Sequence, residues 1–118
     1  MTKIYHLSSC STCQRIIKEL DFPMDTIFQD IKTEKITTQQ IEDMAHLTGS
    51  YNFLFSRRAM KYKSLGLKDQ NLTELDYKRL ILEEYTFLKR PVILHHNQIF
   101  VGNSKKTVEQ AQLAIHES

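Results

Sequence analysis

The sequence has no tryptophan and only three glycines, two prolines and two cysteines. With so little glycine and proline, it contains no low-complexity segment and no interdomain linker. No run of apolar residues approaches the length of a membrane span, and the first residues lack the apolar stretch of a signal peptide. We therefore expect a protein of the reducing cytoplasm that makes no contact with membranes.

The length and composition indicate one globular domain. A chain of 118 residues that is 41% hydrophobic and 25% charged is large enough for a single core. The net charge of +2 does not by itself indicate nucleic-acid binding, so we expect no direct binding of that kind. We expect a domain of this size to be a monomer.

The chemistry that the sequence indicates centres on Cys10-Ser11-Thr12-Cys13. This C-x-x-C pair follows a short apolar run, residues 4–7, and opens a stretch with helical spacing, an arrangement typical of redox sites. The free backbone N–H groups at the start of a helix favour the thiolate of Cys10. Cys13 lies one turn further along and is able to close a disulfide. We predict that Cys10 is the nucleophile and that Cys13 resolves the product of its attack.

Two cysteines three residues apart also occur in zinc sites, in structural disulfides and as inert thiols. Half of a zinc site is disfavoured because there is no second C-x-x-C and no histidine has ligand spacing around the pair, so we expect no metal. A structural disulfide is disfavoured because so local a bridge closes almost no loop and adds little stability. Two inert thiols that pack as small apolar groups stay an alternative.

Apolar spacing predicts a β-α-β unit of thioredoxin type at the start of the chain. We expect a strand over 3–7, a helix over 12–20 and a second strand over 26–29, with Ile27 and Phe28 inside.

A helical middle is expected to follow this unit. Thr37 and Gln40 form a capping box for a helix that ends at Gly49. A shorter helix is expected over 57–65, and Thr73 caps a third.

The last part of the chain returns to strands. Residues 92–94 and 99–101 predict an antiparallel hairpin, and Ser104 caps a last helix. Without the helical middle, at about residues 36–88, the order is that of a thioredoxin core. The predicted fold class is therefore α/β, thioredoxin-like (β-α-β … β-β-α) with an inserted helical subdomain, in one domain spanning 1–118.

Three further positions are candidates for the neighbourhood of the thiols. In a thioredoxin-like core, Arg90-Pro91 lies across from the redox loop, and the fold usually makes this proline cis. Arg90 would then stabilise a thiolate and bind an oxyanion through two parallel hydrogen bonds. His6, four residues before Cys10, either tunes the thiol or is a hydrogen-bonded strand histidine. Arg57 and Arg58 open the shorter helix, and the alternative is two solvated surface arginines.

These blocks resemble the arsenate-reductase-like (ArsC) family of thioredoxin folds, which includes the Spx-type transcriptional regulators. The resemblance covers essentially the full length, and the order and spacing of the blocks are more specific than any single one. The matching segments are Tyr5-His6-Leu7-Ser8-Ser9-Cys10-Ser11-Thr12-Cys13, Ser56-Arg57-Arg58 with Tyr62-Lys63-Ser64-Leu65-Gly66-Leu67 behind it, Leu88-Lys89-Arg90-Pro91-Val92-Ile93, and Val101-Gly102.

The resemblance implies a thiol-dependent reductase in which Cys10 attacks an oxyanion such as arsenate. Arg90 and an arginine at the start of the inserted helix, for which the regulator-like spacing favours Arg58, would bind the oxyanion. Pro91 would be the cis-proline beside the site. A second thiol, from glutathione, glutaredoxin, thioredoxin or Cys13, would complete the reduction, and no bound cofactor is implied.

The sequence departs from the glutaredoxin-coupled reductases in several places. Leu7-Ser8 stands where they carry Asn-Pro, Cys13 stands where they carry serine, and Lys105 replaces a third arginine after the fourth strand. The C-x-x-C pair and Val101-Gly102 are closer to the regulator branch. The alternative is therefore a redox-sensing regulator that binds the C-terminal domain of the RNA polymerase α subunit through a Cys10–Cys13 disulfide switch. Gly49 lies near the glycine of that contact but is offset, and the basic C-terminal extension of the regulators has no counterpart here.

Overall fold

The computed structural model describes residues 1–117 and divides the chain into two compact units. The first, here called the sheet unit, contains Met1–Lys35 and the chain from Arg90 onward. The second, the helical unit, is Ile36–Lys89. Each unit is described by itself, and the union of the two in one domain stays a prediction. No helix within residues 1–117 is both long and apolar enough to cross a membrane.

The sheet unit is built on four strands, which confirms the α/β class. They are β1 (Thr2–His6), β2 (Ile27–Asp30), β3 (Val92–His95) and β4 (Gln98–Val101), in the spatial order β2-β1-β3-β4. β1 pairs with β2 in parallel, whereas the β1–β3 and β3–β4 pairs are antiparallel. The β3–β4 hairpin that the sequence predicts is confirmed.

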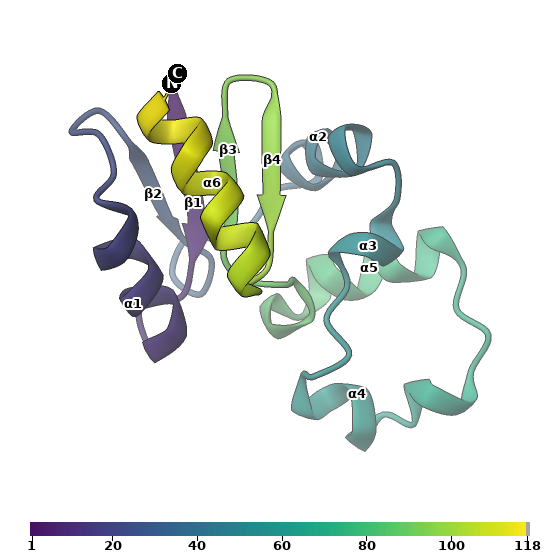
Figure 1. Cartoon of the computed structure of the whole chain (residues 1–118). Coiled ribbons are helices and arrows are strands. Elements are labelled where there is room, and N and C mark those ends of the chain that lie inside the picture. Colours follow the sequence, from purple (N-terminus) through teal and green to yellow (C-terminus); the bar gives the residue numbers. More distant parts are fainter. Residues whose placement is uncertain (118) are drawn as a thin grey trace. The chain divides into compact units, whose positions relative to one another are not determined.

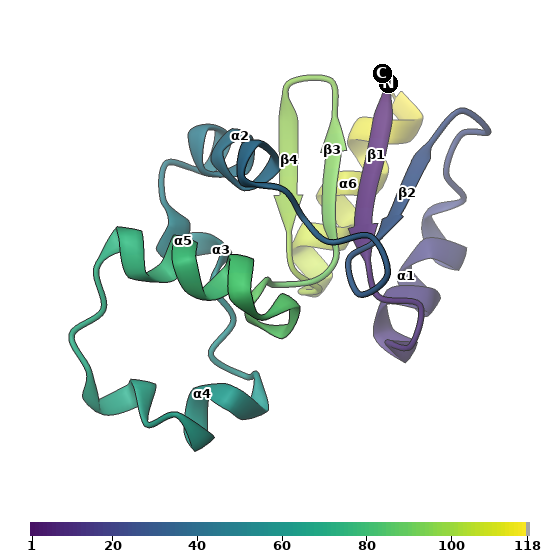
Figure 2. The same cartoon turned by 180° about the vertical axis from the view of Figure 1, so that it is seen from behind.

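Two helices, α1 (Ser11–Leu20) and α6 (Lys105–Glu117), cover one face of this sheet (Figures 1 and 2). The parallel β1–β2 pair requires a crossover connection, and α1 provides it. Apolar residues spaced three or four apart on α1 and α6 meet the alternate residues of the central strands. The core of the unit consists of Ile4, Ile16, Leu20, Ile93, Ala111 and Ile115.

The prediction that Ile27 and Phe28 lie inside is wrong. Their exposed fractions are 44% and 46%, whereas Gln29, the next residue of β2, is only 1% exposed. β2 is an edge strand, so its side chains have neighbours on one side only. The buried side-chain amide of Gln29 donates a hydrogen bond to the carbonyl of Glu34 at 3.1 Å, which compensates for its lost hydration.

The helical unit contains four α-helices and two short 3₁₀ helices (Figure 2). The predicted caps are confirmed: Thr37 and Gln40 form a capping box, Gly49 ends the first helix with φ of 89°, and Thr73 caps a later helix together with Asp76. The elements are α2 (Thr38–Thr48), α3 (Tyr51–Leu54), α4 (Met60–Ser64), η1 (Leu67–Asp69), α5 (Glu74–Glu83) and η2 (Tyr85–Phe87).

The expected helix over 57–65 begins later than predicted. α4 starts at Met60, and Arg57 and Arg58 lie in the turn before it. The reason is a strand-like pairing that keeps the preceding chain extended. The N–H of Ser56 donates to the carbonyl of Phe87 at 2.7 Å, and the N–H of Lys89 donates to the carbonyl of Leu54 at 2.9 Å.

Candidate functional site

The two cysteines lie where β1 gives way to α1. After β1 the chain makes a turn over Leu7–Cys10, closed by a 3.1 Å hydrogen bond from the Cys10 N–H to the Leu7 carbonyl. Cys10 is the N-cap of α1, and its carbonyl accepts the first helical hydrogen bond, from the Gln14 N–H at 3.1 Å. Both thiols are free; Cys10 is partly exposed and Cys13 is fully buried. The thiol nearer the surface is therefore the one at the helix N-terminus.

The surroundings of Cys10 favour its thiolate. Partial burial by itself would raise the pKa of Cys10, because a buried charge loses hydration. Hydrogen bonds from the N–H and thiol of Cys13 and from the N–H of Thr12, together with the positive charge of Arg90, outweigh burial, so that the pKa is lowered. This is the effect expected of a helix N-terminus on a cysteine.

Cys13 has the opposite character. Burial raises the pKa of the Cys13 thiol to about 11, and the hydrogen bond and negative charge of Cys10 add to this effect. The Cys13 thiol therefore stays protonated at neutral pH, whereas Cys10 releases its proton more readily than an ordinary thiol. Because the thiolate is the nucleophilic form of a cysteine, this contrast agrees with Cys10 as the nucleophile and Cys13 as the resolving thiol, and both roles stay predictions.

Arg90 and Pro91 lie in the same unit as the thiols. The Arg90–Pro91 peptide bond is cis, Pro91 is buried, and its carbonyl accepts a hydrogen bond from the Gly102 N–H at 2.9 Å. The positive charge of Arg90 lowers the pKa of both Cys10 and Cys13. The sheet unit thus brings together two thiols and one guanidinium from segments about eighty residues apart.

We expect alkylation of Cys10 by iodoacetamide to reach its plateau at a lower pH than alkylation of an ordinary thiol. The rate follows the thiolate fraction, which rises with pH through the pKa of Cys10, and that pKa is lowered. Arg90→Gln removes a positive charge that favours the thiolate, so its profile should move to higher pH. Stopped-flow alkylation with mass spectrometry measures both profiles.

Arg15→Gln is the matched control for that measurement. Arg15 lies on α1 with a side chain that is 59% exposed and paired with Glu19 at 3.0 Å. Its replacement should leave the Cys10 profile unchanged, because surface charges are screened by solvent. A wild-type profile with the pH dependence of an ordinary thiol would contradict the assignment of Cys10 as the nucleophile.

His6 is buried at the end of β1 with an exposed fraction of 9%. Its ring lies edge-on against Phe28, with centroids 5.9 Å apart, and its Nδ1 has no hydrogen-bond partner among residues 1–117. His6 lies opposite Asp30 in the parallel register of β1 and β2. Tuning of the thiol by His6 stays a prediction.

Arg58 belongs to the helical unit, where its side chain is exposed. Arg57, its neighbour, is held in place: its Nη2 donates to Asn52 Oδ1 at 2.7 Å and to the Tyr77 hydroxyl at 3.0 Å, and its guanidinium lies over the rings of Phe55 and Tyr77. Arg57 is therefore a structural residue of this unit, which agrees with the preference for Arg58 as the candidate ligand. The role of Arg58 in an oxyanion site stays a prediction.

One contact of the turn before Cys10 is not indicated by any sequence pattern. The hydroxyl of Ser8, inside the turn before Cys10, donates a 2.6 Å hydrogen bond to Asp30 Oδ2 at the end of β2. Twenty-two positions separate the two residues, and no local pattern links them. Only the parallel register, which pairs His6 with Asp30, could have indicated their proximity.

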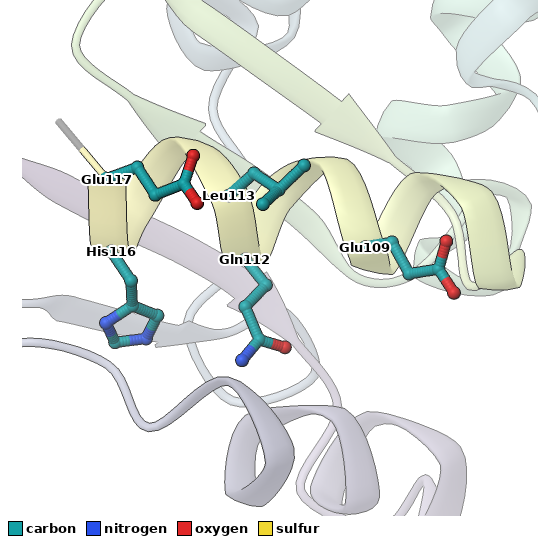
Figure 3. Close-up of a pocket in the computed structure, with 5 residues that line it drawn as sticks. All are labelled: Glu109, Gln112, Leu113, His116 and Glu117. Carbon is teal, nitrogen blue, oxygen red and sulfur yellow. The ribbon is translucent and has the colours of Figure 1, made fainter.

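Two further features of the described residues concern metal binding and the surface of α6. Within residues 1–117 no cluster of three or more His, Cys, Asp or Glu side chains could hold a metal ion. A hollow on the surface of α6 is lined by Glu109, Gln112, Leu113, His116 and Glu117 (Figure 3). His116 at its end donates a hydrogen bond to the carbonyl of Leu20, the last residue of α1, so it ties the two helices together.

Comparisons with known proteins agree with this architecture. The model of the ArsC family matches residues 5–111. Among solved structures, an arsenate reductase from Vibrio cholerae is similar with a TM-score of 0.77 at 18% identity, covering 97% of this chain and 96% of its own. A possible arsenate reductase from Streptococcus mutans has a TM-score of 0.73 at 24% identity, covering 94% and 97%. These similarities confirm the thioredoxin-like fold.

Curated relatives include regulators as well. The global transcriptional regulator Spx 2 of Bacillus cereus is 21% identical over 112 residues, which cover 93% of this chain and 86% of the relative. Spx of Bacillus subtilis is 22% identical over 114 residues with the same coverage. The predicted kinship with both the reductases and the Spx-type regulators is therefore confirmed, and the comparisons do not separate the two functions.

Proposed function

The chain belongs to the ArsC family, and on this premise we propose that it is a thiol-dependent oxidoreductase of the arsenate-reductase type. The observation that carries the proposal is the contrast between the two thiols. The pKa of Cys10 is lowered while burial raises that of Cys13 to about 11, and the charge of Arg90 acts on both. A thiol that ionises readily, a thiol that stays protonated and a guanidinium are the groups that the proposed two-electron reduction of an oxyanion uses.

In the proposed first step, the Cys10 thiolate attacks the arsenic of arsenate. A sulfur–arsenic bond forms, and the bond from arsenic to one hydroxyl breaks; this hydroxyl takes up a proton from the solvent and leaves as water. Arg90 stabilises the negative charge that gathers on the remaining oxygens, because its planar guanidinium donates two parallel hydrogen bonds to an oxyanion. Arg58 is proposed as the second cation of this site.

In the proposed second step, the sulfur of another thiol attacks the sulfur of Cys10, and the proton of that thiol passes to an oxygen of the departing arsenite. The new disulfide takes the place of the sulfur–arsenic bond, whose electron pair passes to arsenic, so that As(V) leaves as As(III) in arsenite. The two thiol sulfurs together lose the two electrons that arsenic gains. Cys13 is the proposed resolving thiol, and glutathione, glutaredoxin or thioredoxin is the proposed external donor that restores the reduced state or acts in its place.

Arg90→Ala is expected to lower arsenate-dependent NADPH oxidation by about 10²-fold, the usual scale for removing one charge-stabilising donor. The assay is coupled in parallel to glutathione with glutaredoxin and to thioredoxin. Arg90→Lys keeps the charge but loses the two-pronged donor, so an intermediate rate is expected. Arg15→Ala, on the exposed side of α1, should retain the wild-type rate.

The same assay separates the second candidate function, a redox-sensing regulator. The similarity to Spx regulators along 93% of the chain favours it, as do two free thiols with C-x-x-C spacing. The RNA polymerase α subunit is the proposed partner, with contact governed by the Cys10–Cys13 disulfide. No turnover with either donor, from protein whose thiols still form a reversible disulfide and whose oxidation changes capture of the α subunit, would favour regulation and contradict the reductase.

Both candidate functions need thiols that are kept reduced between cycles. We therefore propose a cytoplasmic location, where glutathione and thioredoxin maintain that state. The sheet unit carries both thiols and Arg90, so no second copy of the chain is needed to complete these three groups. A monomer is accordingly proposed as the working form.

A further inference from the structure

The turn that presents Cys10 is tied to the sheet at one side chain. Leu7 and Cys10 close this turn, and the two residues between them are Ser8 and Ser9, both exposed. The Ser8 hydroxyl donates a 2.6 Å hydrogen bond to Asp30 Oδ2, whereas Ser9 has no side-chain partner among residues 1–117. One of two adjacent serines therefore connects the turn to β2.

Asp30 is a firm anchor for this contact. Its other carboxylate oxygen, Oδ1, accepts the N–H of Lys32 at 3.1 Å, and its carbonyl accepts the N–H of Glu34 at 2.8 Å. Its backbone is held in the sheet opposite His6, whose carbonyl accepts the Ile31 N–H at 2.9 Å. The hydrogen bond to Lys32 and the backbone hydrogen bonds around Asp30 thus hold its carboxylate in place for the contact with Ser8.

The position of this turn determines which hydrogen-bond donors surround the sulfur of Cys10. Hydrogen bonds from the N–H groups of Thr12 and Cys13 favour the thiolate, and they depend on where the helix N-terminus places Cys10. Helix α1 and the turn are joined at Leu7, whose carbonyl accepts both the Cys10 N–H and Gln14 Nε2 at 3.2 Å. A turn released at Ser8 has more freedom to move the sulfur away from those donors.

We propose that Asp30 is a positioning residue for Cys10 that acts through the hydroxyl of Ser8. The inference rests on the proposed role of Cys10 as a nucleophile. Asp30 carries a negative charge, which by itself would disfavour a thiolate nearby. Its contribution is therefore the hydrogen bond that holds the turn.

The test is the pH profile of Cys10 alkylation in the full chain, read by mass spectrometry. Ser8→Ala and Asp30→Ala should each slow alkylation at neutral pH by roughly three- to tenfold, the scale of one net hydrogen bond. The double variant should be no slower than either single variant, because the same contact is lost in each. Ser9→Ala is the matched control and should behave as wild type.

Asp30→Asn separates positioning from charge. Asparagine keeps the shape of the side chain and still pairs with the Ser8 hydroxyl, so positioning predicts a profile close to wild type. A direct effect of the charge predicts faster alkylation, since a negative group has been removed. The equilibrium between the Cys10–Cys13 disulfide and glutathione supplies a second measurement, and a thermal melt shows that each variant is folded.

Three results would overturn the inference. The effects of Ser8→Ala and Asp30→Ala on the alkylation rate could add fully in the double variant, or their pH profiles could match that of Ser9→Ala. The third is faster alkylation of Cys10 in Asp30→Asn than in the wild type. These measurements use neither arsenate nor polymerase. An ordinary thiol profile in the wild-type protein would remove the proposed function itself. A Cys10 profile at lower pH than that of an ordinary thiol, unchanged by Ser8→Ala and Asp30→Ala, would exclude the positioning role alone.

Discussion

Cys10→Ser is expected to abolish the redox chemistry of the chain, lowering arsenate turnover by about 10⁴-fold or more, on the scale of the loss of a nucleophile. A serine hydroxyl stays protonated where the thiol ionises, and the donors that lower the pKa of Cys10 then have no thiolate to stabilise. The replacement is nearly isosteric at a partly exposed position, so the fold should persist. Coupled NADPH oxidation and a near-ultraviolet spectrum measure the two effects.

Cys13→Ser is the matched variant because the other member of the same pair is changed in the same way. A serine hydroxyl still donates toward Cys10, so the Cys10 thiolate and its alkylation should be kept. The variant loses only the resolving thiol. Cys10 should then accumulate as a mixed disulfide with glutathione, and turnover should depend on glutaredoxin.

Equal losses in both variants would contradict the division of labour between the two thiols. Retained turnover in Cys10→Ser would exclude Cys10 as the nucleophile. Retained turnover with thioredoxin alone in Cys13→Ser would show that an external thiol resolves the adduct. The contrast in pKa, lowered at Cys10 and raised to about 11 at Cys13, is the physical reason to expect unequal outcomes.

Local signals in the sequence predicted most of the fold. The capping box of Thr37 and Gln40 and the cap at Thr73 are made by side chains within three residues of each other, so they can be recognised from the sequence alone. The C-x-x-C pair at the start of α1 is equally local, because strand, turn and helix follow one another directly. The placement of the two cysteines at the start of a helix could therefore be predicted from neighbours in sequence.

Features that depend on tertiary neighbours could not be predicted in the same way. Ile27 and Phe28 have the apolar character of buried residues, but β2 is an edge strand and leaves them about half exposed. Helix α4 starts at Met60, later than the pattern predicts, and the pairing of Ser56 with Phe87 keeps the chain before it extended. Both errors arise from contacts whose partners the sequence pattern does not name.

The contact between Ser8 and Asp30 belongs to the same class. It requires the parallel register in which Ile4 lies opposite Phe28 and His6 opposite Asp30. A shift of one residue in that register would turn the Asp30 side chain to the other face of the sheet. The candidate site is therefore predictable at its thiols and at Arg90, whereas the support of its turn emerges only from the folded sheet.

The aromatic cluster of the helical unit carries the second large expected effect. Phe55 is fully buried there and stacks on Phe87 with centroids 5.0 Å apart and 22° between the rings. The ring centroids of Tyr77 and Tyr62 lie 4.9 Å and 6.0 Å from that of Phe55. The guanidinium carbon of Arg57 lies over the Phe55 ring, 5.6 Å from its centroid. One side chain thus joins the chain before α4 to α5 and η2.

Phe55→Ala is expected to lower the free energy of unfolding by about 3–5 kcal/mol, since a large cavity replaces a fully packed ring. Urea denaturation followed by circular dichroism measures the loss. Amide hydrogen exchange should accelerate at Ser56 and Lys89, whose N–H groups are bonded across the segments that Phe55 holds together. A loss of this size is a large part of the stability of a small domain.

Phe53→Ala supplies the matched control two residues away. The Phe53 ring is 51% exposed, and the Lys89 ammonium lies over it, 4.7 Å from its centroid. Its removal should cost about 1 kcal/mol or less, the scale of an exposed cation–π contact. Similar losses for Phe53→Ala and Phe55→Ala would contradict the claim that burial of Phe55 organises the cluster, because the two substitutions delete the same atoms and differ only in what surrounds them.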